Sequence, residues 1–170
     1  CTGGYTGQTL NPLLANRLMP ILSNSAVTRP LTDAEVSACQ FKSRVFMTDT
    51  RTLRFYYRLL QDAQGQHGLQ LGSRSSITGA EAEDPVHLKL LTDAIARKFP
   101  PLAGIAIEHS WWGWVDVSHD MMPRIVRPDP KQSIWYAVGY GGNGVSFSTW
   151  AGKRLAERVA GQDTGRCTPK

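Results

Sequence analysis

The chain has 170 residues and a formal net charge of +5, and its basic residues are scattered among acidic ones. This pattern argues against nucleic-acid binding, because proteins with that function gather lysine and arginine on one face or in one tract. Three widely spaced cysteines without a C-x-x-C pair indicate neither a disulfide framework nor a zinc site, and they favour a reduced, cytoplasmic setting. No apolar stretch approaches the roughly 20 residues of a membrane span, so we expect no membrane association.

The N-terminal part predicts a glycine loop followed by short elements. Residues 1–7 resemble the end of a buried strand that runs into a glycine loop, which indicates that the chain begins in mid-domain. Leucines at helical spacing predict a short helix over 8–19, with Pro12 in its first turn. Residues 20–31 are apolar and β-branched and predict an extended segment. The stretch from Thr32 to Glu35 predicts the cap and first turn of a helix.

Alternation of apolar and polar residues predicts a β-hairpin further along. The alternation covers residues 53–60 and resumes over 69–71 after a polar loop, which is typical of two antiparallel strands. One face of the first strand would be core and the other could line a ligand cavity. Period two puts these side chains on the first face: Leu53, Phe55, Tyr57 and Leu59. It puts these on the second: Arg54, Tyr56 and Arg58.

A helix is predicted next, from a cap at Asp84 through Lys98. Pro85 suits its first position, and the prolines at 100 and 101 end it. Its buried stripe is predicted to be Leu88, Leu91 and Ile95.

The last part of the chain predicts two β segments and a helix. Residues 105–117 are β-prone and carry three tryptophans, which could wall a ligand site or belong to the core. A short apolar strand over 134–138, of the kind buried on both faces, leads into a glycine-rich run over 139–145. An amphipathic helix over 146–160 follows, in which Ala151 and Gly152 would permit close packing on a sheet.

The glycine-rich run between strand and helix is the most informative local feature. Glycine lets the backbone approach a ligand closely, and the N–H groups at a helix start favour anions. A phosphate, a carboxylate or an anionic cofactor ring could bind there. The same pattern also occurs where a chain simply reverses direction, so the motif alone leaves both interpretations open.

Several motifs in succession resemble a known family. The likeness is to the C-terminal part of FAD-dependent amine and amino-acid oxidoreductases, the superfamily of D-amino-acid oxidase, glycine oxidase and sarcosine oxidase. Within it, the γ-glutamylputrescine oxidase group is most similar. The likeness covers essentially the whole chain in the right order. The motifs that carry it are Thr2-Gly3-Gly4-Tyr5, Tyr57-Arg58, Trp111-Trp112-Gly113-Trp114-Val115-Asp116, Met122-Pro123-Arg124-Ile125 and Gly139-Tyr140-Gly141-Gly142-Asn143-Gly144.

The resemblance implies an α+β fold in two parts. An antiparallel substrate-domain sheet with helices would occupy residues 8–133. Residues 1–7 and 134–161 would be the end of one strand, and the returning strand, turn and helix, of a split Rossmann-type FAD domain, with a tail over 162–170. The N-terminal G-x-G-x-x-G turn that holds the FAD pyrophosphate in this family is not in this chain. We therefore expect that half of the flavin site to lie in sequence not present here.

The resemblance also implies site residues. FAD would lie against Gly3, Gly4, Gly113, Gly141, Gly142, Asn143, Gly144 and Val145. The substrate would lie against Tyr56, Tyr57, Arg58 and Trp114, and no catalytic residue is identified.

Two departures from the family pattern bear on the cofactor and the substrate. Sarcosine oxidases attach flavin through a cysteine at the position of Gly113, so non-covalent FAD is expected here. Glycine and D-amino-acid oxidases carry a carboxylate-binding arginine at the position of Val115. An amine without an α-carboxylate is therefore the expected substrate.

The expected activity of the whole protein is oxidation of an amine C–N bond to an imine by hydride transfer to flavin, with oxygen as acceptor. The isolated fragment is expected to be inactive. The alternative is a non-catalytic β-sheet binding or assembly module, or a truncated remnant without flavin. His109 and His119 are interpreted as ordinary side chains, and Asp116, His119 and Asp120 as too few for a metal site. The oligomeric state stays open, with a homo-oligomer among the options.

Overall fold

A computed structural model describes residues 3–5, 11–52, 54–76 and 85–162. The chain divides into two compact units, which we describe separately: Cys1–Ile21 with Trp114–Lys170, and Leu22–Gly113. The divisions fall within two strands, β1 (Met19–Thr28) and β5 (Ile107–Val117). Among the described residues, no helix has both the length and the apolar composition that crossing a membrane requires.

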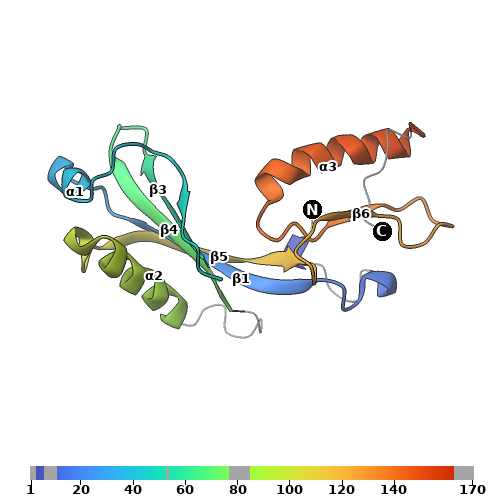
Figure 1. The fold of residues 1–170 in the computed structure, drawn as a ribbon, viewed down its shortest axis with the longest axis horizontal. Helices are drawn as coiled ribbons and strands as arrows, with labels where there is room; N and C mark the ends of the chain where they lie inside the picture. Colours follow the sequence, from blue (N-terminus) through green and yellow to red (C-terminus); the bar gives the residue numbers. More distant parts are fainter. Residues whose placement is uncertain (1–2, 6–10, 53, 77–84, 163–170) are drawn as a thin grey trace. The chain divides into compact units, whose positions relative to one another are not determined.

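The unit Leu22–Gly113 is built on an antiparallel sheet (Figure 1). Its five strands have the order β2-β3-β4-β1-β5. Strands β3 and β4 form the predicted hairpin, and β1 pairs antiparallel with β4. The predicted hairpin and the extended segment after residue 20 are therefore confirmed. The bounds of the remaining strands are Met47–Thr48 for β2, Phe55–Gln61 for β3 and His67–Ser76 for β4.

The alternation along β3 sorts its side chains between the two faces of the sheet as predicted. Phe55 and Leu59 are buried, and Tyr57 packs against the same core cluster, whereas Arg58 is exposed. Leu59 pairs with Leu69, so apolar side chains from both strands meet on one face. Leu53, the first residue of the predicted face, lies outside the described residues. The hairpin loop closes on Asp62, whose carboxylate accepts hydrogen bonds from two loop N–H groups, at 2.9 and 2.8 Å.

Two helices belong to this unit, and both follow their sequence signals. The first, α1 (Asp33–Ala38), begins with a capping box in which Thr32 and Glu35 satisfy each other's backbone N–H groups. Arg29 holds the Glu35 carboxylate by a 2.7 Å ion pair, and its hydrogen bond lowers the pKa of Glu35 to about 2. The second helix, α2 (Pro85–Lys98), ends at a 3-10 turn, η3 (Pro100–Leu102), as the prolines predict.

The buried stripe of α2 differs from the prediction. Leu91 and Ile95 are buried, but the third buried residue is Ala94. Leu88 is 37% exposed instead. The helix packs with its later turns against the core face of the sheet (Figure 1), so a small residue close to the strands contributes more than the predicted leucine one turn earlier.

The opposite face of this sheet is organised around Tyr56. Tyr56 stands opposite Gly72, and a Cβ at Gly72 would lie only 2.4 Å from the Tyr56 ring. The ring therefore lies directly over the β4 backbone. Its hydroxyl reaches β1, where it lies 3.2 Å from the Ser23 hydroxyl and 3.0 Å from that of Ser25.

In the other unit, the predicted helix over residues 8–19 is wrong. Residues 8–10 lie outside the described residues, and the rest forms only a 3-10 turn, η2 (Pro12–Leu14), before β1 begins at Met19. The Asn11 side chain accepts the Leu13 N–H at 2.9 Å, and Asn16 has a positive φ of 58°. These local features favour a turn and stop helix propagation despite the leucine spacing.

The C-terminal strand, turn and helix are present as predicted, but the strand and the helix are less buried than expected. Strand β7 (Tyr136–Val138) pairs antiparallel with β6 (Arg124–Val126), and α3 (Gly144–Val159) follows the glycines. Burial on both faces is wrong for this strand, since only Val138 is buried and Ile134 is 49% exposed. In α3 only Ala151 is buried, and a Cβ at Gly152 would meet nothing within 4 Å. Gly152 is therefore not required for packing within this unit.

Two glycine substitutions should have opposite effects on stability. Gly72→Ala would force the Tyr56 ring off β4 and away from Ser23 and Ser25, so we expect a loss of about 1–3 kcal/mol. Gly152→Ala places a methyl group in open space in mid-helix and should stabilise by about 0.5–1 kcal/mol. Equilibrium urea unfolding of each variant beside the unaltered protein measures both effects. A Gly72→Ala protein as stable as the parent would contradict the packing of Tyr56 on Gly72.

Candidate functional site

The glycine-rich turn between β7 and α3 needs its glycines for their backbone conformation. Gly139, Gly141 and Gly142 have φ values of 77°, 58° and 92°, a region that side chains with a Cβ rarely adopt. Gly139 is also limited by space, because a Cβ there would lie 3.3 Å from the Ser118 Cβ. The turn therefore has a defined shape that few other sequences would adopt.

Asp116, near the end of β5, holds this turn in place. Its carboxylate accepts the Gly139 N–H, and its backbone carbonyl accepts the Gly141 N–H at 2.9 Å. The next residue, Val117, forms a bridge with Tyr140. Asp116 is only 5% exposed, so its carboxylate is removed from water and depends on such donors. The Asp116 side chain and the backbone of Asp116 and Val117 thus fix the path of the turn.

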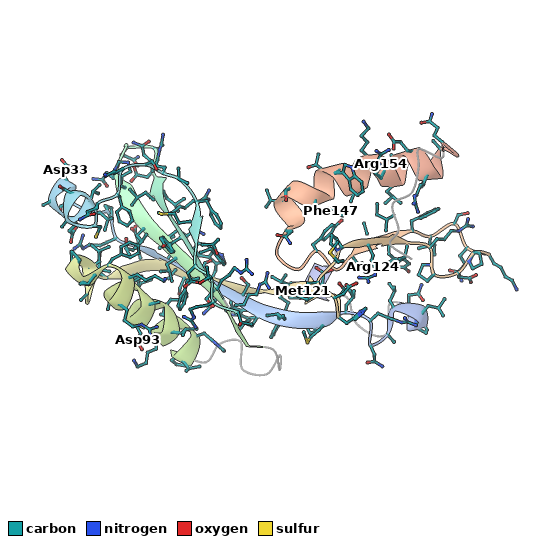
Figure 2. All side chains as sticks on the ribbon, in the orientation of Figure 1. Asp33, Asp93, Met121, Arg124, Phe147 and Arg154 are labelled. Carbon is teal, nitrogen blue, oxygen red and sulfur yellow. The ribbon has the colours of Figure 1, made fainter. Side chains whose placement is uncertain are left out.

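Aromatic contacts connect the turn to α3. The Tyr140 ring lies 5.9 Å from the Phe147 ring, which in turn lies 4.9 Å from Trp150. Phe147 projects from the early part of α3 (Figure 2). Burial, and to a smaller extent the negative charge of Asp116, raises the pKa of the Tyr140 hydroxyl. Tyr140 therefore stays neutral at physiological pH.

The start of α3 offers backbone donors. Asn143 occupies the N-cap position, but its side chain makes no capping hydrogen bond. The first N–H groups of any α-helix have no acceptor within the helix. Val145 is 95% exposed, so the first turn is open. An anionic group could be bound here by backbone N–H groups and the positive end of the helix dipole.

The spacing of Gly139, Gly141 and Gly144 also matches the G-x-G-x-x-G pattern of dinucleotide-binding turns. That pattern needs a strand of a parallel βαβ unit in front of it. Here the preceding strand, β7, pairs antiparallel with β6. The context therefore favours a site for another anionic group over a pyrophosphate cradle.

The N-terminal glycines lie beside β5. Gly3 and Gly4 belong to a 3-10 turn, η1 (Gly3–Tyr5), and a Cβ at Gly4 would lie 2.5 Å from the Trp114 carbonyl carbon. The Tyr5 hydroxyl accepts the Trp114 N–H at 3.4 Å. The structure therefore brings together Gly4 and Trp114, which lie far apart in the sequence.

A polar loop between β5 and β6 is built on one ion pair. The Arg124 guanidinium donates to both oxygens of Asp120, at 2.8 and 2.5 Å, and the Met122 N–H donates to the same carboxylate at 3.0 Å. Figure 2 labels Met121 and Arg124 in this segment. These hydrogen bonds, that of Arg124 first, hold the pKa of Asp120 well below its ordinary value of 3.8.

The loop borders a hollow of about 470 Å³ within the same unit. His119 and Arg124 line it together with apolar side chains from η2 and from β6 and β7. In the part of the chain that the structure describes, no three His, Cys, Asp or Glu side chains are grouped to hold a metal ion.

The predicted substrate residues of the sheet separate onto two faces. Tyr57 packs edge-on against Phe99, 5.4 Å away, on the core side, whereas Tyr56 and Arg58 lie on the opposite face. A single cavity above one face can therefore contact Tyr56 and Arg58 but not Tyr57. Trp111 and Trp112 are 48% and 39% exposed, so they are not core residues in this structure, and the nearby Gly113 is half-buried.

Sequence reasoning missed the role of Asp116 and the polar partners of Tyr56. The sequence suggests for Asp116 only a place in a metal cluster that is too small, and its contact with Gly139 spans 23 residues without a sequence signal. Ser23 and Ser25 could have been found from the alternation of β1, where small polar residues stand on one face among apolar neighbours. Their contact with Tyr56 depends on the strand order, which the sequence alone does not give.

Comparisons with known proteins identify the family. The family model described as FAD dependent oxidoreductase, DAO, matches residues 1–158. Gamma-glutamylputrescine oxidoreductase of Escherichia coli (strain K12) is 29% identical over 157 residues, with 92% of this chain and 35% of the relative covered. The probable oxidoreductase OrdL of Haemophilus influenzae is 32% identical over 152 residues, with 86% of this chain and 31% of the relative covered.

A solved structure has the same fold. A thermally stable mutant of fructosyl peptide oxidase superposes with a TM-score of 0.69 at 17% identity, with 95% of this chain and 41% of that one covered. The chain belongs to the DAO family of FAD-dependent oxidoreductases. It spans about a third of the length of the curated relatives above.

Removing the Asp116 carboxylate should loosen the glycine turn. Asp116→Ala leaves the Gly139 N–H without its acceptor in a buried position, which should cost about 1–3 kcal/mol. Asp116→Asn keeps an acceptor oxygen and should cost less. Amide hydrogen exchange at Gly139 and Gly141 measures the effect directly, with Asp129→Asn in an exposed turn as control. Unchanged protection of both glycines in Asp116→Ala would contradict the assigned role.

The Asp120–Arg124 pair should contribute to acid sensitivity. Because the pKa of Asp120 is lowered in the folded state, its stabilising contribution is complete above the ordinary value of 3.8 and is lost as the pH falls through the lower folded value. As the pH is lowered from about 6 to about 2, the urea midpoint should fall less steeply below pH 3.8 in Asp120→Asn than in the parent. Equal acid slopes in the two proteins would refute the effect.

Proposed function

We propose that the whole protein is an FAD-dependent oxidoreductase that oxidises a C–N bond of an amine to an imine, with oxygen as the electron acceptor. Membership of the DAO family supports the cofactor and the reaction class. The observation that carries the proposal is the turn from Gly139 to Val145, a preset backbone that opens an uncapped helix. The name of the Escherichia coli relative, gamma-glutamylputrescine oxidoreductase, supports an amine rather than an α-amino acid as substrate.

The residues present fit a flavin ring at this turn. We propose that the N–H groups of Gly142, Gly144 and Val145 are donors toward it. Gly141 and Asn143 would lie against the ring as part of the turn, since their N–H groups donate to the Asp116 and Tyr140 carbonyls at 2.9 Å. The fit rests on the open first turn of α3 and on Gly142, which is exposed directly before it. Gly3 and Gly4, which the structure places in η1, would contact the cofactor from the N-terminal loop.

The link to the cofactor would be non-covalent. Gly113 occupies the position at which related enzymes carry the linking cysteine, and glycine has no side chain to form that bond. The remaining contacts, including those to the pyrophosphate, would come from the part of the protein that corresponds to the rest of the relatives' length.

FAD, when bound, accepts the hydride that leaves the carbon next to the amine nitrogen. The role of this chain is to stabilise the negative charge that develops at the turn. Preorganised backbone N–H groups suit that role because they need no rearrangement as the charge forms. A helix terminus contributes about 0.3–2 kcal/mol, which adjusts the energy of the reduced state without accounting for the whole rate.

We propose that the two compact units have different roles in the enzyme. The unit Cys1–Ile21 with Trp114–Lys170 would be the flavin side, and Leu22–Gly113 the substrate side. These divisions lie inside the boundaries of 7/8 and 133/134 expected from the sequence. Tyr56 and Arg58 would provide substrate contacts from the sheet, and Trp114 from the end of β5.

Flavin reduction tests the proposal. Anaerobic mixing of the purified full-length protein with primary and secondary amines should bleach the flavin absorbance, and amines lacking an α-carboxylate should react faster than matching α-amino acids. Val115→Arg restores the carboxylate-binding arginine of related enzymes and should shift the preference toward α-amino acids.

Two other outcomes of the flavin-reduction experiment would contradict parts of the proposal. Bleaching by α-amino acids alone would contradict the substrate assignment. A protein that purifies without flavin, or whose flavin no amine or amino acid reduces, would contradict the enzyme and favour a non-catalytic module.

A further inference from the structure

The loop over residues 118–123, which joins β5 to β6, packs against the first glycine of the turn. A Cβ at Gly139 would lie 3.3 Å from the Ser118 Cβ and 3.5 Å from the Met122 carbonyl oxygen. Ser118 is only 4% exposed, so this contact is largely closed to water. Both sides of the contact belong to the same compact unit. The loop therefore limits the positions that Gly139 can adopt.

The neighbouring parts of the turn lie beside the same loop. The Met121 carbonyl oxygen lies 3.7 Å from the position of a Cβ at Gly141. On the strand before the turn, Val138 pairs with Arg124, the first residue of β6. Asp116 holds the turn through hydrogen bonds. The loop is therefore a second support for the turn, and it acts through packing.

The shape of the loop depends on the pair of Asp120 and Arg124. The Asp120 carboxylate accepts the Met122 N–H at 3.0 Å, and Arg124 donates to the Met122 carbonyl oxygen at 2.8 Å. Arg124 also donates to both oxygens of the Asp120 carboxylate. The peptide groups on either side of Met122 are thus fixed by two charged side chains that fix each other. The Met122 carbonyl is also the one that faces Gly139.

Ser118 connects the ion pair to the turn. Its hydroxyl lies 3.0 Å from an Asp120 oxygen and 2.8 Å from the Met122 carbonyl oxygen, while its Cβ lies against Gly139. An isolated ion pair at the surface contributes little to stability. This pair differs because its two-oxygen geometry and its shared contacts join it to a buried serine. A change in the pair should therefore reach the turn.

We propose that Asp120 and Arg124 are positioning residues for the bound flavin, which act through the loop on the glycine turn. The proposal rests on the proposed function for the flavin, whereas the support of the turn rests on contacts within this structure. Backbone donors stabilise a developing charge best when they are held in place before the charge forms. A loosened loop would let the turn move, which weakens binding of the negatively charged reduced flavin more than binding of the oxidised form. The ion pair therefore favours the reduced flavin.

A double variant that keeps the net charge tests the proposal. Asp120→Asn combined with Arg124→Gln removes the pair but leaves the net charge unchanged. In the full-length protein, the reduced flavin should lose about threefold more affinity than the oxidised one, which lowers the two-electron midpoint potential by about 14 mV. Ser118→Ala, which alters no charge, should shift the potential in the same direction. The matched control is Lys89→Gln with Asp93→Asn, which removes an exposed i,i+4 ion pair from α2 in the other unit and should leave the potential unchanged.

The two single variants distinguish positioning from a direct effect of charge. Asp120→Asn removes a negative charge and Arg124→Gln a positive one, so the fields of these charges alone would shift the potential in opposite directions. A positioning role predicts that both variants lower it, and that the double variant lowers it by less than the sum of the two. Titration at about 1 M salt screens exposed charges beyond about 3 Å. Opposite shifts under these conditions would overturn the positioning role.

Amide hydrogen exchange separates this proposal from the proposed function, because the measurement needs no flavin. In the double variant, the Gly139 and Gly141 amides should exchange at least about threefold faster than in the parent and in the control, while the amides of β3 in the other unit should not change. Faster exchange in β3 as well would indicate a general loss of stability and would overturn the local role.

The remaining outcomes bear on one proposal or the other. Unchanged exchange at both glycines, or an unchanged potential, would overturn the positioning role and leave an oxidoreductase with a reducible flavin standing. Faster exchange at the glycines in a protein that carries no reducible flavin would overturn the proposed function and leave the support of the turn by the loop standing.

Discussion

The hydrogen bonds of Asp116 to the glycine turn are the constraint on which the proposed flavin side depends. A turn with three glycines at positive φ has many conformations in an unfolded chain, so ordering it is costly unless other groups fix it. Asp116 fixes it from two directions, with its carboxylate on Gly139 and its carbonyl on Gly141. A buried carboxylate that lost these donors would be unfavourable, so the turn and Asp116 stabilise each other.

The sheet of the other unit uses a glycine in a different way. Gly72 is needed for its missing side chain, because the Tyr56 ring occupies the space where a Cβ would lie. The consequence is a rigid aromatic ring that brings its hydroxyl across a whole strand to β1. In the turn, glycine is needed because the backbone has a positive φ. In the sheet, Gly72 is needed because its missing side chain leaves space for the Tyr56 ring. Both devices position polar groups without relying on long flexible side chains.

The sequence predicted those elements whose own residues determine them. Alternation determined the faces of β3, and the capping box at Thr32 determined the start of α1, because both signals are local. The prediction is wrong where contacts with other residues determine the local structure. Leucine spacing could not reveal that Asn11 would start a turn, nor that Ala94 rather than Leu88 would face the strands. For the glycine turn, the sequence indicates the glycines but not Asp116, since the contact of Asp116 with Gly139 joins distant parts of the chain.

The chemistry that the glycine turn can perform follows from the groups that form it. Backbone N–H groups at a helix start carry a fixed partial charge that no change of pH removes, so they suit a charge that appears and disappears during a reaction. A guanidinium group would carry a full charge before and after the reaction, so it suits recognition of a permanently charged group rather than a charge that forms during the reaction.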